Sequence, residues 1–228
     1  MADRVLIIED DADVATFEKM ILERNGYEVR VASTGSAGLE AEPVFKPAVV
    51  LLDVELPDIS GLDVCTSLAN SSDAFILMVS AHSSENDVLK GLGLGADDYI
   101  RKPFSGNELV ARVQSFLRRR ERSRKTDHEG RLTIGGATLV RDFHTCENDG
   151  KFVTLTALEF RLLWYLAENV GKLLTRAQIL ERVWNDVSGV PTRVVDVHVA
   201  ALRKKLNEVG ATLAISSVRG IGYRLDER

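Results

Sequence analysis

Four short apolar runs in the first half of the chain each end at a residue suited to metal or phosphate chemistry. Residues 5–8 run into Glu9 and Asp10, residues 49–52 into Asp53, residues 75–79 into Ser80, and residues 99–101 into Lys102. Continuous apolar runs of this length are typical of parallel strands buried on both faces. Because ligand sites of open α/β sheets lie outside the carboxyl ends of the strands, we expect these residues to share one pocket.

Amphipathic segments separate the apolar runs, which predicts a βα series over residues 1–119. The fold class expected there is α/β, a doubly wound five-stranded parallel sheet. In the first helix Val14, Phe17 and Ile21 recur at helical spacing, Asp11 or Asp13 caps the start, and Asn25-Gly26 ends it. The second strand is expected at 28–32 and the last helix from near Asn107 to near Arg119.

A basic run follows this series, with six basic residues among the eight from Arg118 to Lys125. Such a run usually belongs to a solvated segment that weakly attracts phosphates, so residues 120–130 are predicted to be a linker. Upstream, residues 91–95, Gly-Leu-Gly-Leu-Gly, are expected to close a helix and to leave it loosely held.

Residues 131–228 have a different pattern, with short polar and apolar segments separated by turns. Gly-Gly and Asp-Gly turns predict a small antiparallel sheet. Helices are then expected at 156–169, 175–184 and about 192–207, followed by a hairpin of 213–218 with 223–225, which together describe an α+β winged helix-turn-helix. Residues 1–119 carry 20 acidic and 11 basic groups, and residues 120–228 carry 14 and 18. The basic second half therefore suggests nucleic acid as its partner.

The pocket carboxylates predict a magnesium-assisted phosphorylation site. Three carboxylates within a few ångströms repel one another by ~4 kcal/mol per pair at an effective dielectric constant near 20. One lysine cannot offset this repulsion, whereas Mg²⁺ can, because it prefers oxygen ligands and retains several waters. An ionised Asp53 can attack a phosphoryl group directly, while Mg²⁺ and Lys102 spread the developing charge.

Several motifs in order carry a family resemblance that covers essentially the whole chain. In the first half they are Ile7-Ile-Glu-Asp10, Leu52-Asp53 with Pro57 and Gly61, Ser80-Ala81, and Gly95-Ala-Asp-Asp-Tyr-Ile-Arg-Lys-Pro-Phe104. In the second half they include Val195-Asp-Val-His198, Leu202-Arg-Lys-Lys-Leu206 and Val218-Arg-Gly-Ile-Gly-Tyr223. The first set resembles a flavodoxin-like response-regulator receiver domain, and the second resembles an OmpR/PhoB-type winged-helix effector.

The resemblance implies a role for each pocket residue. Asp53 would accept phosphate from a sensor histidine kinase, Ser80 would follow the phosphoryl group, Tyr99 would then turn inward, and Lys102 would pair with the phosphate. His82, with Glu55, would set the lifetime of the phosphate. The implied Mg²⁺ ligands are Glu9, Asp10, Asp53 and Glu55.

The resemblance also implies a phosphorylation-dependent homodimer. Glu108, Arg112 and Arg119 are spaced by four and seven residues, which puts them on one helix face. By resemblance they would meet Lys90, Asp97 and Asp98 of a partner subunit.

The third helix of the second half is expected to read DNA. Val195, Val199, Leu202 and Leu206 fall on one narrow stripe that must face the core. The opposite side would enter the major groove, and it comprises Arg193, Val197, Ala200, Ala201 and Lys204. Family members commonly carry arginine at the position of Ala201 and a polar or basic residue at that of Ala200, so base reading by a bidentate arginine is in doubt here.

Other DNA and polymerase contacts are expected around this helix. Arg193, Arg203 and Lys204 would contact phosphates, and Arg219 would contact the minor groove, with Tyr223 also on the DNA-binding surface. Binding is expected at tandem half-sites about one helical turn apart. Residues 185–191 would form a loop directed toward RNA polymerase.

Two alternatives remain open from the sequence. One is a dimeric transcription factor that works without phosphorylation. The other is a Mg²⁺-dependent phosphohydrolase with an aspartyl intermediate, using Asp11 and Asp13, although this pair comes two residues too late for a nucleophile at a strand end. We expect a regulator without enzymatic function, soluble and cytoplasmic and not bound to a membrane, because there is no apolar run of ~18 residues and no signal peptide.

Overall fold

The computed structural model describes residues 2–81, 84–125, 130–184 and 191–227, which divide into two compact units. The units are Met1–Thr126 and Asp127–Arg228. Each unit is considered by itself below.

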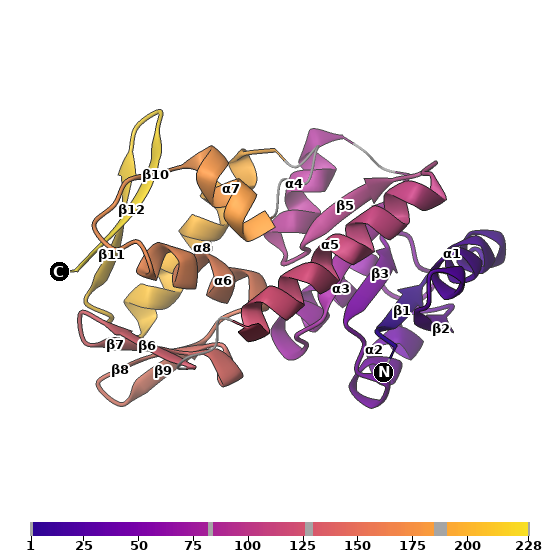
Figure 1. The fold of residues 1–228 in the computed structure, drawn as a ribbon, viewed down its shortest axis with the longest axis horizontal. Coiled ribbons are helices and arrows are strands. Elements are labelled where there is room, and N and C mark those ends of the chain that lie inside the picture. The colour runs from indigo at the N-terminus through magenta and orange to yellow at the C-terminus, as the bar shows by residue number, and fades with distance from the viewer. Residues whose placement is uncertain (1, 82–83, 126–129, 185–190, 228) are drawn as a thin grey trace. The chain divides into compact units, whose positions relative to one another are not determined.

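The first unit contains a five-stranded parallel sheet of order β2-β1-β3-β4-β5 (Figure 1). The strands are β1 (Arg4–Ile8), β2 (Glu28–Ala32), β3 (Val49–Asp53), β4 (Phe75–Ser80) and β5 (Asp98–Arg101). The helices are α1 (Ala12–Arg24), α2 (Gly35–Phe45), α3 (Gly61–Ser71), α4 (Glu85–Gly93) and α5 (Gly106–Lys125). The predicted doubly wound fold is confirmed.

Alternation along the strands sends side chains to helices on both faces of the sheet. Val5 and Ile7 of β1 pack in one core cluster with Leu22 of α1 and Val113 of α5. Ile8, the next residue after Ile7, approaches Gly38 of α2 on the other face. Both faces of the sheet are therefore covered, as continuous apolar strands require.

The core face of α1 lies one residue along from the stripe of Val14, Phe17 and Ile21. Its buried residues are Ala15, Glu18 and Leu22. Phe17 is 37% exposed, and its ring lies 6.1 Å from that of Phe104. Both stripes have the same helical spacing, and the buried stripe includes a glutamate.

Helix α5 extends six residues beyond its expected end, to Lys125. The basic run contains arginine, lysine and glutamate, which favour helices, and it contains no glycine or proline. Residues 120–125 of the predicted linker therefore belong to a helix.

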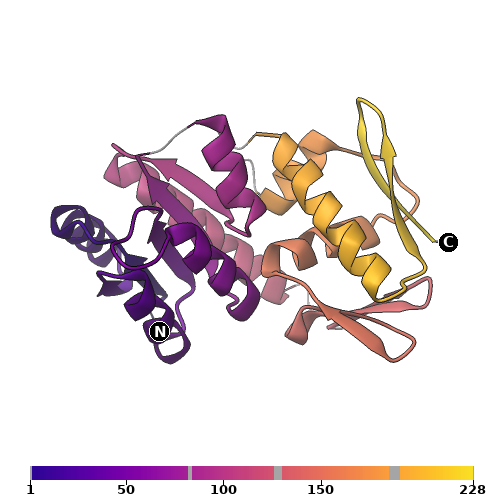
Figure 2. The ribbon, with the colours of Figure 1, turned by 180° about the vertical axis from the view of Figure 1, so that it is seen from behind.

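The second unit begins with an antiparallel sheet of order β6-β7-β8-β9 and continues into a winged helix (Figure 2). The sheet strands are β6 (Arg131–Ile134), β7 (Ala137–Val140), β8 (Thr145–Asn148) and β9 (Lys151–Thr154), with a 3₁₀ turn at Arg141–Phe143. The helices are α6 (Ala157–Ala167), α7 (Arg176–Trp184) and α8 (Arg193–Glu208). A second sheet of order β10-β12-β11 closes the unit, with β10 (Leu174–Thr175), β11 (Leu213–Val218) and β12 (Gly222–Glu227).

The stripe predicted for α8 is confirmed as its core face. Val195, Val199 and Leu202 are 0% exposed, and Leu206 is 2% exposed. Helix α8 packs against β11 of the closing hairpin. At Gly222 of β12 any Cβ would collide with the carbonyl of Leu174, so glycine is required where β10 joins this sheet.

Candidate functional site

The carboxyl ends of β1, β3 and β5 form one acidic pocket. Glu9 and Asp10 follow β1, Asp53 ends β3, and Lys102 follows β5. Glu9 and Asp53 are buried, whereas Asp10 is exposed. One carboxylate oxygen from each of the three acidic residues lies within 4.8 Å of those from the other two.

Lys102 joins two of these carboxylates. Its Nζ donates to Oε1 and Oε2 of Glu9 at 3.0 and 2.7 Å and to Oδ2 of Asp53 at 2.6 Å. Burial acts to lower the pKa of Lys102, but the bonds to Asp53 and Glu9 outweigh it and raise this pKa. Lys102 therefore stays charged and neutralises part of the pocket.

The negative charge that Lys102 does not neutralise is unfavourable in this buried pocket. Burial raises the pKa of Glu9 to about 7, and the charge of Asp53 adds to this effect, while the bond from Lys102 opposes it. A divalent cation would relieve the repulsion. Three carboxylates with one of them exposed form a donor set that fits Mg²⁺, which binds oxygen and retains waters.

The loop after Asp53 is braced on one side. Oδ1 of Asp53 accepts the amide of Glu55 at 3.0 Å. Gly61 donates its amide to the carbonyl of Val54 at 3.0 Å, and a Cβ at Gly61 would collide with the carbonyl of Asp53. Only glycine allows α3 to begin this close to the acidic residue.

Asp58 ties the same loop to α2. Its carboxylate accepts the amides of Gly35 and Ser36, each at 2.9 Å. Hydrogen bonds from Ser36 and from the Gly35 amide hold the pKa of Asp58 well below its usual range. This brace was not anticipated from the sequence, because its partners lie more than twenty residues away.

The residues expected to sense the phosphate also lie together. Ser80, at the end of β4, is fully buried, and its backbone carbonyl accepts the amide of Lys102 at 2.8 Å. Tyr99 is buried, and its hydroxyl shares a hydrogen bond with Ser80. Burial raises the pKa of Tyr99, and this bond opposes the rise. Tyr99 is thus turned inward here, and its predicted movement in step with Ser80 stays a prediction. The side chain of Glu55 is exposed, and its predicted role at the metal stays a prediction.

The residues expected at a dimer interface make bonds inside the chain. Arg112 pairs with Asp98 and with Glu108, at 2.6 and 3.0 Å. Oδ2 of Asp97 accepts the amide of Ile76 at 2.9 Å. Lys90 is exposed, and the side chain of Arg119 lies outside the described residues, as do His82 and residues 185–190.

The predicted DNA-reading face of α8 is accessible. Arg193, Ala200 and Lys204 are exposed, Val197 is 40% exposed, and Ala201 is half-buried. Arg219 is exposed at the hairpin turn. These residues offer cationic and small apolar groups of the kind that bind phosphates and thymine methyls.

Arg203 and Tyr223, also predicted to bind DNA, join α8 to the hairpin. Nε and Nη2 of Arg203 donate to the carbonyl of Ile215 at 2.9 and 2.6 Å, and Nη2 also donates to Ser217 at 2.7 Å. Tyr223 is 5% exposed. The structure therefore gives both residues an internal role that the sequence analysis missed.

Asp196 is the acceptor at the centre of this junction. The hydroxyl of Tyr223 donates to Oδ1 of Asp196 at 2.6 Å, and Nε of Arg176 donates to the same oxygen at 2.8 Å. The Arg176 guanidinium also lies over the Tyr223 ring, 5.0 Å from its centroid. Helices α7 and α8 and strand β12 are therefore tied at one point.

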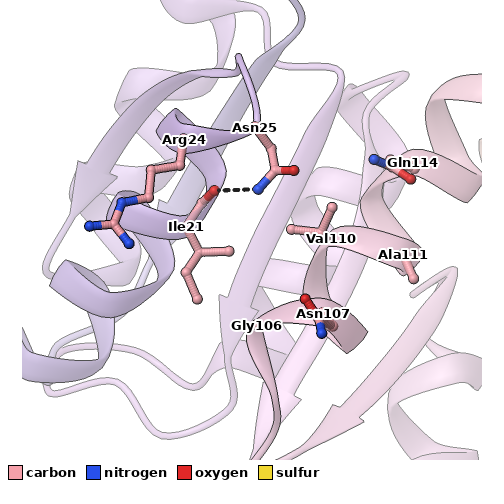
Figure 3. Close-up of a pocket in the computed structure, with 8 residues that line it drawn as sticks. All are labelled: Ile21, Arg24, Asn25, Gly106, Asn107, Val110, Ala111 and Gln114. Carbon is pink, nitrogen blue, oxygen red and sulfur yellow. Dashed lines mark hydrogen bonds between the residues drawn. The ribbon is translucent and has the colours of Figure 1, made fainter.

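A separate pocket of about 280 Å³ lies between α1 and α5 (Figure 3). Asn25 donates to the carbonyl of Ile21 there at 2.9 Å. The lining combines aliphatic and amide groups with one cation and lacks carboxylates, so the acidic pocket remains the candidate for phosphate chemistry. The lining residues are Ile21, Arg24, Asn25, Gly106, Asn107, Val110, Ala111 and Gln114.

Within the described residues, none of the helices combines the length and the apolar content needed to span a membrane.

Two family models match the chain. The response regulator receiver domain matches residues 5–114, and the family described as transcriptional regulatory protein, C terminal, matches residues 150–225. The chain is 38% identical over 235 residues to the alkaline phosphatase synthesis transcriptional regulatory protein PhoP of Bacillus subtilis, covering 100% of this chain and 98% of the relative. It is 38% identical over 225 residues to the DNA-binding response regulator MtrA of Mycolicibacterium smegmatis, covering 98% and 97%.

Solved structures agree with these matches. A RitR mutant superposes with a TM-score of 0.83 at 28% identity, covering 100% of both chains. The response regulator DrrB, described as a Thermotoga maritima OmpR/PhoB homologue, gives a TM-score of 0.51 at 32% identity and covers 99% of this chain and 100% of its own.

Proposed function

Because this chain belongs to the OmpR/PhoB family of two-component response regulators, we propose that phosphorylation of Asp53 controls its activity as a transcription factor. The observation that carries this proposal is the acidic pocket, in which Lys102 lies 2.6 Å from Asp53 and 2.7 Å from Glu9. Asp10 completes the acidic cluster.

Each residue of the pocket would have its own role in phosphotransfer. One Asp53 oxygen attacks phosphorus, the P–N bond to the histidine of a sensor kinase breaks, and the electron pair stays on the imidazole. Lys102 pairs with the transferred phosphoryl oxygens, and Ser80 contacts them. Glu9, Asp10, Asp53 and Glu55 would hold Mg²⁺, which would supply charge neutralisation when bound.

The output would combine dimerisation with DNA binding. We infer that the α4–β5–α5 face dimerises on phosphorylation and that α8 and the hairpin bind tandem half-sites in promoter DNA. Residues 185–191 would contact RNA polymerase. Residues 1–119 would serve as the receiver and residues 131–228 as the effector of a cytoplasmic regulator.

The rival phosphohydrolase is disfavoured by the position of Asp11. Its side chain accepts the amides of Asp13 and Val14 at 2.9 and 3.1 Å, so it caps α1. A carboxylate used in this way is poorly placed as a nucleophile.

The test is labelling by a small acyl phosphate in the presence of Mg²⁺. Wild type and Asp11→Asn should become phosphorylated, and Asp53→Asn should not. A label that persists in Asp53→Asn would contradict the assignment. Dimerisation and DNA binding without any labelling of wild type would favour the phosphorylation-independent regulator.

A further inference from the structure

The buried face of α1 carries a carboxyl group that interacts with the charges of the acidic pocket. Glu18 is 1% exposed and lies between Ala15 and Leu22 in the core stripe of the helix. Within the described residues, neither oxygen of its carboxyl group has a hydrogen-bond partner. Burying a carboxylate without a partner is far more costly than burying the neutral acid, so the surroundings decide its charge.

Three charged groups around Glu18 belong to the pocket. They are Glu9 after β1, Asp53 at the end of β3 and Lys102 after β5. Burial raises the pKa of Glu18 to about 8, the charge of Glu9 adds to this rise, Lys102 opposes it, and Asp53 adds to it. Without a cation, Glu18 is therefore mainly neutral at pH 7.

A cation in the pocket would reverse this balance. A divalent cation held by Glu9, Asp10 and Asp53 attracts a nearby carboxylate and cancels the repulsion that Glu18 experiences from Glu9 and Asp53. The pKa of Glu18 falls as a result. Between the two pKa values, cation binding releases the proton of Glu18, and by linkage the cation binds more tightly as the pH rises.

We propose that Glu18 is a further residue of the phosphorylation pocket, which loses its proton when a divalent cation binds and thereby strengthens the binding of that cation. This inference rests on the proposed function of the pocket. Glu18 is a positioning residue, because it acts through the charges of the pocket. A glutamate that merely filled the core would leave cation binding unchanged.

The experiment is calorimetric titration of the full-length protein with MgCl₂. Measurements in two buffers of different ionisation enthalpy count the protons released per cation. Wild type should release more protons than Glu18→Gln and should bind Mg²⁺ about 10-fold more tightly near pH 8, because a nearby opposite charge shifts a carboxyl pKa by ~1–3 units. The difference in affinity should shrink toward about pH 6, where Glu18 of wild type keeps more of its proton.

Glu23→Gln is the matched control, because Glu23 lies on the same helix, is exposed, and forms an ion pair of 3.8 Å with Lys19. This control should behave as wild type. If Glu18→Gln fails to fold, Glu18→Leu serves instead, and the same loss of affinity and of proton release is expected.

Two results would overturn the inference. Equal Mg²⁺ affinity and equal proton release in wild type and in the Glu18 variants would remove Glu18 from the pocket and leave the proposed function standing. Failure of wild type itself to bind Mg²⁺ would contradict both proposals.

Discussion

Arg112 and Asp98 form an ion pair within a single chain, with Nη1 of the arginine 2.6 Å from Oδ2 of the aspartate. Asp98 is 1% exposed. Burial raises the pKa of Asp98 to about 6, and Arg112 opposes that rise. Both groups are predicted to join a partner subunit, so dimerisation would exchange an internal pair for an intermolecular one, and the cost of breaking the first pair reduces the gain from the second.

The dimer prediction concerns Arg112→Glu. This variant should remain monomeric in sedimentation after phosphorylation, because the new glutamate would face the carboxylate of Asp98 where the dimer needs an ion pair. Adding Asp98→Arg should restore some dimer by reversing the pair. Arg118→Glu, an exposed change on the same helix, is the control. Normal dimerisation of Arg112→Glu would place the interface elsewhere.

Arg112→Met should make the stability of the first unit strongly dependent on pH. The raised pKa of Asp98 means that its neutral form is favoured on folding, so its contribution to stability is lost as pH rises through this pKa. Without Arg112 the pKa rises further, and the variant should lose about 3 kcal/mol near pH 8 and less near pH 5. Denaturant unfolding at both values measures this, and a loss independent of pH would contradict it.

Glu18→Leu should stabilise the first unit, with a gain that grows with pH. The pKa of Glu18 is raised to about 8 in the folded state, so folding becomes less favourable as pH rises from the unfolded value toward 8. The gain should increase by roughly 2–4 kcal/mol between about pH 5 and pH 8. It should be measured by denaturant unfolding without Mg²⁺, and a constant gain would show that Glu18 does not titrate there.

Tyr223→Phe should weaken the junction between α8 and the hairpin. The variant loses the 2.6 Å bond to Asp196, with an expected cost of about 1–2 kcal/mol. DNA affinity should fall with it, because the hairpin is less firmly held against the reading helix. A double-mutant cycle with Asp196→Asn measures the coupling, and additive losses would mean that this bond contributes little.

Ala201→Arg should tighten DNA binding and shift the preferred half-site toward guanine. An arginine there can form two hydrogen bonds to guanine, with a gain of ~1–3 kcal/mol at that base pair. Wild type should rely on phosphate contacts and show a steep salt dependence, ~0.9 log units per phosphate neutralised. Selection from random DNA tests the shift, and identical half-sites for both proteins would show that this face lies outside the groove.

The pocket could be predicted because local patterns fix each of its parts. Each apolar run marks a strand, and the topology of an open parallel sheet brings the strand ends together, so Asp53 and Lys102 could be placed in one site. The core face of α8 could also be predicted from the sequence, because four apolar residues share one stripe at helical spacing.

Other features depend on tertiary packing that no local pattern records. Glu18 lies in the buried stripe of α1, at a position that an apolar residue normally marks. Arg203 looked like a phosphate ligand, and only the fold shows that its guanidinium bonds to Ile215, twelve residues away. The pairing of Asp98 with Arg112 likewise depends on the packing of β5 and α5.

The bonds from Asp58 to the amides of Gly35 and Ser36 give the pocket an unequal mechanical stiffness. On that side the loop after Asp53 is hydrogen-bonded to α2. Gly61 brings the start of α3 into close contact with the same loop. On the other flank α4 contains Gly91 and Gly93, which hold a helix weakly. We therefore expect a strain introduced at Asp53 by phosphorylation to relax toward α4, because that side of the pocket is held less firmly.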